Sequence, residues 1–184
     1  VEQLVATIGT SNIEVLNHDA YYRHRPELTL AERNQVNYDH LDSLETELAL
    51  EHLQKLCSGA RAPLPIYDFS THLRSTEVRW LLPTPVLVIE GILVLQQPEL
   101  RAFMDLKVFV EADPDVRALR RIERDQRERG RTMESIQQQF LDRVKPMHDR
   151  YVDPSRNHAD IVIPNNQQNP EALRTLEARL RTVL

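Results

Sequence analysis

Short apolar runs alternate along the chain with longer segments in which apolar residues recur every three or four positions. Four runs have the length and apolar character of strands: 13–16, 86–89, 106–110 and 160–163. The first three are apolar enough to be buried on both faces of a sheet. Because strands that alternate with helices form parallel sheets covered by helices, the pattern predicts an α/β fold.

Four amphipathic helices are predicted between and after these strands. They span about 43–57, about 114–131, about 132–151 and about 170–184. Gly59 suits the end of the first helix, and Asp113 with Pro114 supplies an N-cap and a first helical residue for the second. Pro146 lacks a backbone donor and predicts a kink in the third helix.

The segment 63–83 follows a different pattern. Its apolar stretches, 66–69 and 78–81, flank a polar turn region, which predicts an antiparallel hairpin that projects from the sheet. The sequence contains no internal repeat, low-complexity tract or linker. We therefore expect one domain across 1–184.

The composition is that of an ordinary globular protein. Of the 184 residues, 41% are hydrophobic and 28% are charged, and no stretch approaches the roughly 20 apolar residues that cross a bilayer. Residues 1–6 lack the basic region of a secretory signal, so we expect a cytoplasmic protein without a membrane partner. The single Cys57 lies in a helical apolar pattern and is predicted to be a buried structural thiol.

The distribution of charge is more informative than its total. The formal net charge is -5, which gives no general footprint for nucleic acid. One short segment nevertheless contains seven arginines: Arg117, Arg120, Arg121, Arg124, Arg127, Arg129 and Arg131. A local arginine cluster on an acidic protein favours a compact anionic ligand over a long polyanion.

Carboxylates follow two of the predicted strands. Glu90 comes directly after the run 86–89, and Asp19 follows the run 13–16. Ligands of open α/β sheets bind beyond the carboxyl ends of the strands, so Glu90 is either a group that meets Mg²⁺ or an ordinary acid at a strand end. Asp19 is either the acceptor of a substrate hydroxyl proton during phosphoryl transfer or a loop acid.

A second set of candidates lies in the loop after Asn37 and in the predicted hairpin. Asp39 has the chemistry to hold a pair of ribose hydroxyls. Tyr67, Phe69 and His72 have side chains that can face a planar base and mark its polar edge. The alternative is that the two aromatic residues pack the hairpin and that His72 is a surface histidine.

The arginine-rich helix also permits two interpretations. Arg117, Arg121 and Arg124 share one helical face because they are four and three positions apart, and Arg129 and Arg131 flank a glycine. Mobile arginines that close over a nucleotide stabilise the charge of phosphoryl transfer, which would make this segment a lid. In a solvated helix the arginines would instead pair with the neighbouring acids, Asp115, Glu123, Asp125 and Glu128.

Taken in order, these motifs resemble the uridine kinase (uridine-cytidine kinase) family, and the resemblance covers about 14–184. The matching segments are 19–23, 37–40, 67–74, 89–93, 120–131, 145–148 and 159–164. The resemblance implies a P-loop NTPase-like fold and phosphorylation of uridine or cytidine at the ribose 5′-hydroxyl, with ATP or GTP as donor and Mg²⁺ as cofactor. It also implies a homotetramer inhibited by pyrimidine nucleoside triphosphates.

The resemblance also assigns roles to individual residues. Asp19 matches the catalytic base, Asp39 and Arg121 match the residues around the ribose hydroxyls, and Glu90 matches the acid near Mg²⁺. Four further residues match positions around the pyrimidine, and two match lid arginines near the phosphates: Tyr67, His72, Arg131 and Gln139, then Arg124 and Arg129. Leu41 and Leu44-Glu45 depart from the family pattern at positions outside these contacts.

The sequence contains no Gly-x-x-x-x-Gly-Lys-Ser/Thr motif, whose backbone amides cradle phosphates in P-loop enzymes. Its four glycines, Gly9, Gly59, Gly91 and Gly130, are far apart, and no Gly-Lys pair is present. Residues 1–6 resemble the later part of the helix that follows such a loop. We therefore expect a strand and a P-loop upstream of Val1, and little turnover by residues 1–184 alone.

There are three alternatives to nucleoside phosphorylation. A phosphoribulokinase-like sugar-phosphate kinase would share the sheet, but Tyr67, Phe69 and His72 suit a flat base better. A catalytically inactive regulatory homologue would retain the pocket without the phosphate loop. RNA binding through the arginine helix would require tight and steeply salt-dependent affinity, which the acidic balance disfavours.

Overall fold

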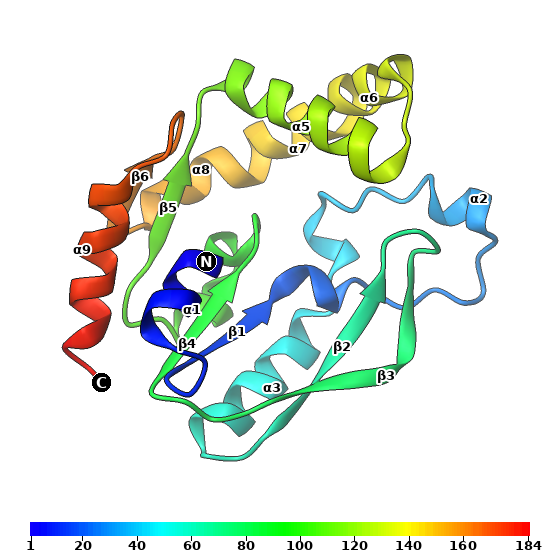
Figure 1. Cartoon of the computed structure of the whole chain (residues 1–184). Coiled ribbons are helices and arrows are strands. Elements are labelled where there is room, and N and C mark those ends of the chain that lie inside the picture. The colour runs from blue at the N-terminus through cyan, green and yellow to red at the C-terminus, as the bar shows by residue number, and fades with distance from the viewer.

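The computed structural model describes residues 1–184 and contains three two-stranded sheets packed among helices (Figure 1). Two sheets are parallel and one is a hairpin. The strands are β1 Ile13–Asn17, β2 Ala62–Asp68, β3 Leu73–Leu81, β4 Val86–Glu90, β5 Val108–Glu111 and β6 Ile161–Pro164. These bounds agree with the predicted runs, and the parallel strands with covering helices confirm the α/β prediction.

The parallel pairs align the ends of strands that are far apart in sequence. In the sheet β1–β4, Ile13 lies opposite Val86 and Asn17 lies opposite Glu90. In the sheet β5–β6, Val108 lies opposite Ile161. Because both strands of a pair run in the same direction, the segments that follow their carboxyl ends meet at one edge.

The antiparallel hairpin β2–β3 covers the predicted segment. Ala62 pairs with Leu81 and Asp68 with Leu73, and the register shifts between Pro65 and Tyr67. In Figure 1 the hairpin extends away from the parallel strands, and its turn lies on the same side of the molecule as α2. The irregularity before Tyr67 alters the direction of the strand end that carries this side chain.

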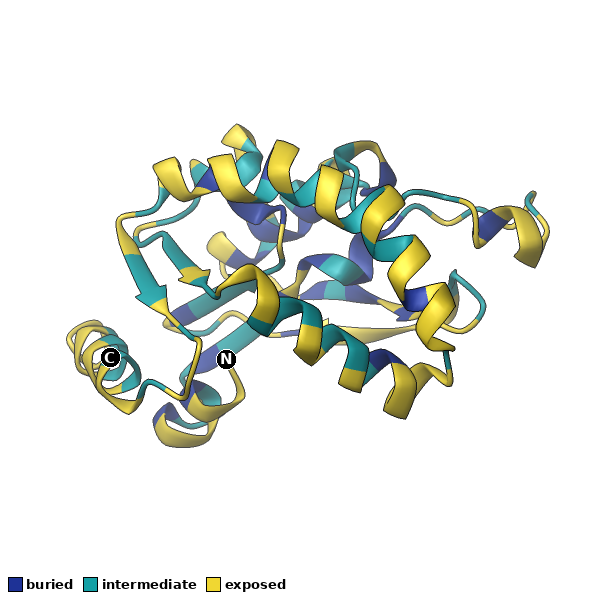
Figure 2. Cartoon of the chain, turned by 90° about the horizontal axis from the view of Figure 1, so that it is seen from above, coloured by how far each residue is buried: buried dark blue, intermediate teal, exposed yellow.

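Helices surround the sheets, and the first and last elements of the chain are also helices. They are α1 Glu2–Ile8, α2 Leu30–Arg33, α3 Thr46–Cys57, α4 Pro98–Arg101, α5 Pro114–Arg129, α6 Met133–Gln139, α7 Lys145–Met147, α8 Asp153–Ser155 and α9 Pro170–Arg181. Figure 2 shows that most of α5 is exposed while the elements beneath it include more buried residues. None of the helices combines the length and apolar character needed to cross a membrane.

The disturbance predicted at Pro146 takes the form of widened helical turns. Pro146 lies in α7, and π-helical segments at Phe140–Val144 and His148–Val152 precede and follow it. A proline inside an α-helix removes one hydrogen bond and clashes with the carbonyl four residues before it. Wider turns accommodate that clash while the helical path from α6 to α8 continues.

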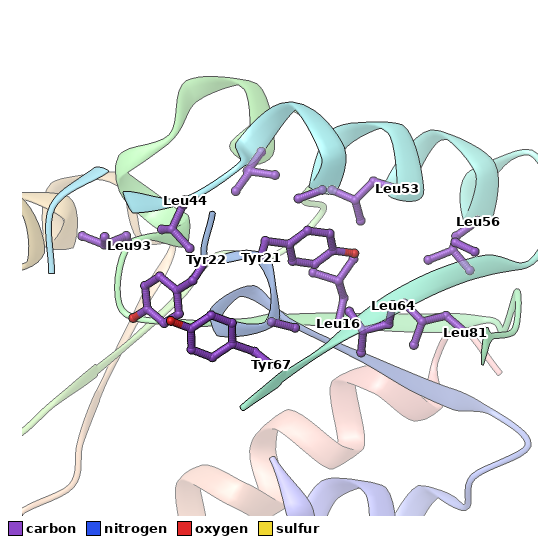
Figure 3. Packing of buried hydrophobic residues seen from close by; sticks show 14 of the residues in the cluster. Leu16, Tyr21, Tyr22, Leu44, Leu53, Leu56, Leu64, Tyr67, Leu81 and Leu93 are labelled. Carbon is purple, nitrogen blue, oxygen red and sulfur yellow. The ribbon is translucent and has the colours of Figure 1, made fainter. Parts of the chain in front are cut away.

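The main core lies where α3 packs over the hairpin and the end of β1. Leu16, Leu53 and Leu81 are fully buried in it, and Figure 3 shows how their side chains gather around Tyr21. The Tyr21 hydroxyl lies 2.9 Å from His52 Nδ1, so this polar tip is satisfied inside the core. Burying one leucine side chain contributes about 1.5–3 kcal/mol, and this cluster therefore anchors the hairpin and the loop after β1.

A smaller core joins the two ends of the chain. Leu4 and Ile8 of α1 pack with Ile13 and Val86, and apolar residues of α9 cover them. The Arg181 guanidinium donates a hydrogen bond to the Thr7 carbonyl oxygen. The first and last helices therefore pack side by side against one edge of the β1–β4 sheet.

Two predictions about burial are wrong. Cys57 is exposed because it is the last residue of α3 and does not point into the core. Residues of β5 are not buried on both faces, since Val110 is 57% exposed. The reason is that β5 pairs only with β6 and β4 only with β1.

An apolar cavity of about 1140 Å³ is lined by all of β4 and β5. Residues of α9, including Leu176 and Leu180, also line it.

Candidate active site

A second cavity, of about 960 Å³, contains the chemistry indicated by the sequence. One side carries five aromatic or imidazole rings, here called the aromatic wall: Tyr22, Tyr38, Tyr67, Phe69 and His72. The other side carries six guanidinium groups, here called the arginine wall: Arg117, Arg120, Arg121, Arg124, Arg129 and Arg131. In Figure 1 the first wall comes from the hairpin and the loops near it, and the second comes from α5 and the turn that follows.

The structure brings nearly all of the predicted site residues to this cavity. Ten of them line it: Asp19, Asp39, Tyr67, Phe69, His72, Arg121, Arg124, Arg129, Arg131 and Gln139. Glu90 lines the neighbouring apolar cavity instead, and Asp19 borders both. The residues therefore form one continuous region with Asp19 at the junction.

Asp19 is held in a tight turn directly after β1. The Asn17 side chain accepts a hydrogen bond of 2.8 Å from the Asp19 amide and caps the 3-10 helix His18–Tyr21. Burial raises the pKa of the Asp19 carboxyl, and Asp39 raises it further, while the Tyr22 hydroxyl and the charge of Arg129 oppose this. A partly desolvated carboxylate with a raised pKa is a better proton acceptor than one in water.

Glu90 lies at the end of β4, beside the turn that carries Asp19. Burial raises the pKa of the Glu90 carboxyl, and the charge of Asp19 raises it as well. The next residue, Gly91, packs so closely on His18 that an added Cβ would lie 2.7 Å from the His18 Cβ. Glycine therefore allows the two strand ends to approach each other.

The aromatic wall is a network of rings from three separate segments: Tyr22, Tyr38 and the hairpin residues 67–72. The Tyr22 ring centroid lies 5.1 Å from that of Tyr38 and 5.2 Å from that of Tyr67. Tyr38 stacks on His72 at 4.6 Å with an interplanar angle of 12°, and Phe69 meets Tyr67 edge-on. Edge-on and offset contacts of this kind stabilise ring pairs beyond their burial.

His72 takes an unusual backbone conformation at the hairpin turn. Its φ of 56° lies in the left-handed region that non-glycine residues rarely adopt. The His72 amide donates to the Asp68 carbonyl oxygen, and the Asp68 carboxylate accepts hydrogen bonds from Ser70 and Thr71. The turn therefore holds the imidazole over Tyr38 and 3.4 Å from the Tyr67 hydroxyl.

The arginine wall is organised by one buried acid, Asp125. Its side chain is fully buried, and its carboxylate oxygens lie 2.9 Å from Arg124, 3.1 Å from Arg131 and 3.4 Å from Arg129. Burial raises the pKa of the Asp125 carboxyl, but Arg124, Arg121 and Arg129 together hold it below its usual value. The Asp125 backbone oxygen also accepts hydrogen bonds from Gly130 and Arg131, so the same residue fixes the turn after α5.

Gln139 and Asp39 both line the cavity and interact with residues of the arginine wall. The Gln139 side-chain oxygen accepts hydrogen bonds of 2.7 Å from Arg121 and 2.6 Å from Arg131. Burial raises the pKa of the Asp39 carboxyl, and the charge of Arg121 opposes that rise. A hydrogen bond of 2.8 Å between the Tyr151 hydroxyl and His40 Nε2 holds the loop that carries Asp39.

The comparisons with known proteins agree with this arrangement. Residues 3–171 match the model of the Phosphoribulokinase / Uridine kinase family. The chain belongs to this family. A uridine kinase from Deinococcus deserti is 44% identical over 182 residues, which cover 99% of this chain and 88% of that protein. A uridine kinase from Geobacillus kaustophilus is 43% identical over 96% of this chain and 83% of that protein.

Solved structures of kinases share the fold of this family member. A possible uridine kinase from Bacillus stearothermophilus has a TM-score of 0.59 and 22% identity, covering 88% of this chain and 78% of that one. The phosphoribulokinase from Rhodobacter spheroides has a TM-score of 0.65 and 18% identity, covering 89% of this chain and 63% of that one. The chain is therefore a phosphotransferase with a P-loop kinase fold.

Several cavity residues of this kinase were not singled out from the sequence as site residues. Tyr22 and Tyr38 complete the aromatic wall, and both stand beside the candidate acids Asp19 and Asp39 in the quoted motifs. Arg143 also lines the cavity and donates hydrogen bonds to the Asn34 carbonyl oxygen and the Gln35 side chain. Its partners lie 108 and 109 positions away, so no local pattern signals this contact.

Asp19 at the junction of the two cavities and Glu90 in the apolar cavity are the carboxylates that could hold a divalent cation. The structure contains no group of three or more His, Cys, Asp or Glu side chains arranged to hold a metal ion. Mg²⁺ in phosphoryl-transfer sites is commonly bound by one or two carboxylates together with water and the phosphates of the substrate. Glu90 and Asp19, whose charge raises the pKa of Glu90, supply such carboxylates.

Proposed function

We propose that the protein transfers the γ-phosphoryl group of ATP to the 5′-hydroxyl of uridine or cytidine. The observation that carries this proposal is the location of Asp19, at the point where a cavity with one aromatic and one arginine wall meets a second cavity bordered by Glu90. A planar base suits the aromatic wall and a phosphate chain suits the arginine wall, and the hydroxyl that is phosphorylated would then lie near Asp19. The relatives named uridine kinase support the same conclusion.

In the proposed reaction Asp19 acts as the general base. The nucleoside O5′ forms a bond to the γ-phosphorus, the bond from that phosphorus to the β-bridging oxygen breaks, and the hydroxyl proton passes to Asp19. ADP leaves with the electron pair. The raised pKa of Asp19 makes the carboxylate a stronger proton acceptor, and the nearby Tyr22 and Arg129 oppose that rise.

The arginine wall supplies positive charge to the phosphates in this proposal. Arg124 and Arg129 line the cavity and are held by Asp125, so they need little reorganisation when charge develops. Mg²⁺, when bound, neutralises phosphate charge at the transferred group. Glu90 is the residue that we expect to hold it or its water shell.

Recognition of the nucleoside is assigned to the remaining cavity residues. Asp39 offers two acceptor oxygens to the ribose hydroxyls, and Arg121 lies where its charge acts on Asp39. Tyr67 and Phe69 offer apolar ring surfaces to the base. The three groups that can mark the polar edge of the pyrimidine are His72, Arg131 and Gln139, the last of which accepts from Arg131.

A sugar-phosphate substrate is the second candidate because the family also includes phosphoribulokinases. The aromatic wall argues against it. Five rings beside one cavity offer large flat surfaces, whereas a sugar phosphate has no flat face to cover. Phosphate recognition would use the arginine wall alone and leave the rings without a role.

Binding and turnover of candidate acceptors test the proposal. Calorimetry on the full-length protein should detect binding of uridine or cytidine, and ADP release should require one of them together with ATP. Ribulose 5-phosphate should give neither signal. The proposal fails if the protein binds ATP but neither nucleoside. GTP as donor, the cytoplasmic location and the homotetramer stay predictions.

A further inference from the structure

Arg117 is the one arginine of α5 without a partner inside the protein. The other five arginines of this helix each contact an acid, an amide oxygen or a carbonyl oxygen: Arg120, Arg121, Arg124, Arg127 and Arg129. Arg117 makes no side-chain hydrogen bond or ion pair, and its Nε atom is buried. A buried charged donor without an acceptor is costly, and such donors normally have partners.

A second unsatisfied group lies beside it. The Nδ1 atom of His148 is buried and has no hydrogen-bond partner, and the nearest acid oxygen, on Asp149, is 3.6 Å away. Burial lowers the pKa of His148, and the charge of Arg117 lowers it further, whereas Asp149 and Asp153 oppose this. Two partly buried side chains, from α5 and from the helical segment after α7, therefore each have a buried nitrogen without a partner in the same region.

That region is the junction of the two cavities. Only five residues line both: Asp19, Ile92, Arg117, His148 and Val152. Asp19 is the proposed acceptor of the hydroxyl proton, and Glu90 borders the apolar cavity beyond the junction. Arg117 is therefore a cation that lines the same junction as the proposed proton acceptor Asp19.

We propose that Arg117, with His148 beside it, contacts the phosphoryl group during transfer. This inference rests on the proposed function, and it adds a phosphate contact outside the arginines tied to Asp125. The equatorial oxygens of the phosphoryl group accept hydrogen bonds from Arg117 as the bond to O5′ forms and the bond to ADP breaks. A planar guanidinium suits this task because it donates two parallel hydrogen bonds to phosphate oxygens.

Arg117→Ala in the full-length protein tests the assignment. The value of kcat should fall about 100-fold, as expected when one donor to the transition-state charge is lost. Uridine affinity in the absence of ATP should not change, because the base and ribose contacts remain. The bisubstrate probe P1-(5′-adenosyl) P4-(5′-uridyl) tetraphosphate joins donor and acceptor nucleosides through phosphates, and its affinity should fall while uridine affinity is retained.

Arg117→Lys and Arg127→Ala complete the experiment. Lysine keeps the charge but loses the planar fork, so this variant should recover part of the lost kcat and remains informative if the alanine variant folds poorly. Arg127 lines neither cavity and pairs with Glu123 and Glu128, so its alanine variant should behave like the wild type. His148→Ala should lower kcat less than Arg117→Ala.

The results separate this inference from the proposed function. If the wild type phosphorylates uridine and folded Arg117→Ala retains its kcat and its affinity for the bisubstrate probe, the inference is wrong and the function stands. An equal loss of uridine affinity and kcat would also overturn it, because Arg117 would then be a general structural support. If the wild type does not phosphorylate uridine or cytidine, the proposed function itself fails.

Discussion

The two walls of the larger cavity are stabilised in different ways. The aromatic wall consists of rings that contact one another, such as Tyr22 with Tyr67 at 5.2 Å and Tyr38 with His72 at 4.6 Å. The arginine wall consists of like charges that repel one another and depend on Asp125, whose carboxylate lies within 3.6 Å of four guanidinium groups. The aromatic wall is therefore stabilised by many weak ring contacts, whereas the arginine wall is stabilised by one acid, Asp125.

This difference predicts how each wall responds to mutation. Loss of one ring from a network of neutral contacts removes a local surface and leaves its neighbours in place. Loss of the shared acid releases several charges at once, because each arginine uses the same two oxygens. We therefore expect small, substrate-specific effects on the aromatic side and larger effects on catalysis and stability on the arginine side.

The largest effect is expected at Asp19, which lies at the junction of the two cavities. Asp19→Asn keeps the shape of the side chain but removes the proton acceptor, so kcat should fall by about 100-fold to 10,000-fold. Uridine affinity should be largely retained, because the residues proposed to face the base, Tyr67, Phe69 and His72, do not include this carboxylate. Steady-state turnover and calorimetry on the full-length protein measure the two quantities.

Asp115→Asn is the matched control for that substitution. Asp115 is exposed on α5 and makes no side-chain hydrogen bond or ion pair, so its amide variant should keep wild-type turnover. Near-normal kcat in Asp19→Asn would remove Asp19 from the role of base. It would also mean that the proton is not transferred at the junction of the two cavities.

Arg129→Ala tests whether the arginine wall acts on the phosphates. Arg129 is held 3.4 Å from the Asp125 carboxylate, and its charge opposes the rise in the pKa of Asp19. Removing it should lower kcat about 100-fold through lost charge stabilisation, with a smaller effect on uridine affinity. Unchanged kinetics would contradict the lid assignment for this residue.

Asp125→Asn tests whether the wall depends on its central acid. The free energy of unfolding should fall by about 2 kcal/mol, because hydrogen bonds to a charged group are lost. The turnover number should fall about tenfold, since misplaced arginines meet the phosphates poorly. Urea denaturation and steady-state kinetics measure these changes.

The pH dependence identifies the charge of Asp125 as the cause. Its pKa is lowered in the folded protein, so its stabilising effect is present above the ordinary aspartate pKa and is lost as pH falls through the lowered value. The difference in unfolding free energy between wild type and Asp125→Asn should shrink over that acidic range. A difference that is constant with pH would mean that packing, and not charge, accounts for the loss.

A smaller effect is expected on the aromatic side from His72→Ala. The ratio of kcat/KM for uridine to that for cytidine should change by about fivefold, equivalent to about 1 kcal/mol for one hydrogen bond. The KM for ATP should change less, because the imidazole lies at the hairpin turn, away from the proposed phosphate contacts. Equal losses for both nucleosides would contradict a role in reading the base.

Much of the fold follows from local pattern. The run 13–16 became β1 Ile13–Asn17 and the run 86–89 became β4 Val86–Glu90, because continuous apolar stretches carry the signal of a sheet strand. Gly59 at φ 83° ends α3 as expected. The exposed face of β5 was not predicted, because burial depends on which strands pair and not on the strand's own residues.

In the candidate site, too, the sequence does not predict which individual residues contact each other. The sequence supplies four acids near the arginine cluster, and spacing alone does not distinguish them. In the structure Asp125 is buried among the wall arginines, whereas Glu123 and Glu128 pair with the exposed Arg127. The ring contacts of Tyr22 with Tyr67 likewise join residues 45 positions apart, so only the folded chain reveals the network.

The smallest effect in this comparison is expected from Tyr22→Phe, which belongs to the aromatic wall but acts on Asp19. The Tyr22 hydroxyl lowers the pKa of Asp19, against the rise caused by burial. Its removal should raise that pKa, and because the base must be ionised, the acidic limb of the profile of kcat/KM against pH should move to higher pH. Tyr38→Phe should leave the limb in place, since the Tyr38 hydroxyl does not contribute to the Asp19 pKa. If the acidic limb of Tyr22→Phe stays at the wild-type pH, the aromatic wall does not affect the pKa of Asp19. That pKa would then be set by the charged groups around Asp19, and the aromatic wall would act on the substrate alone.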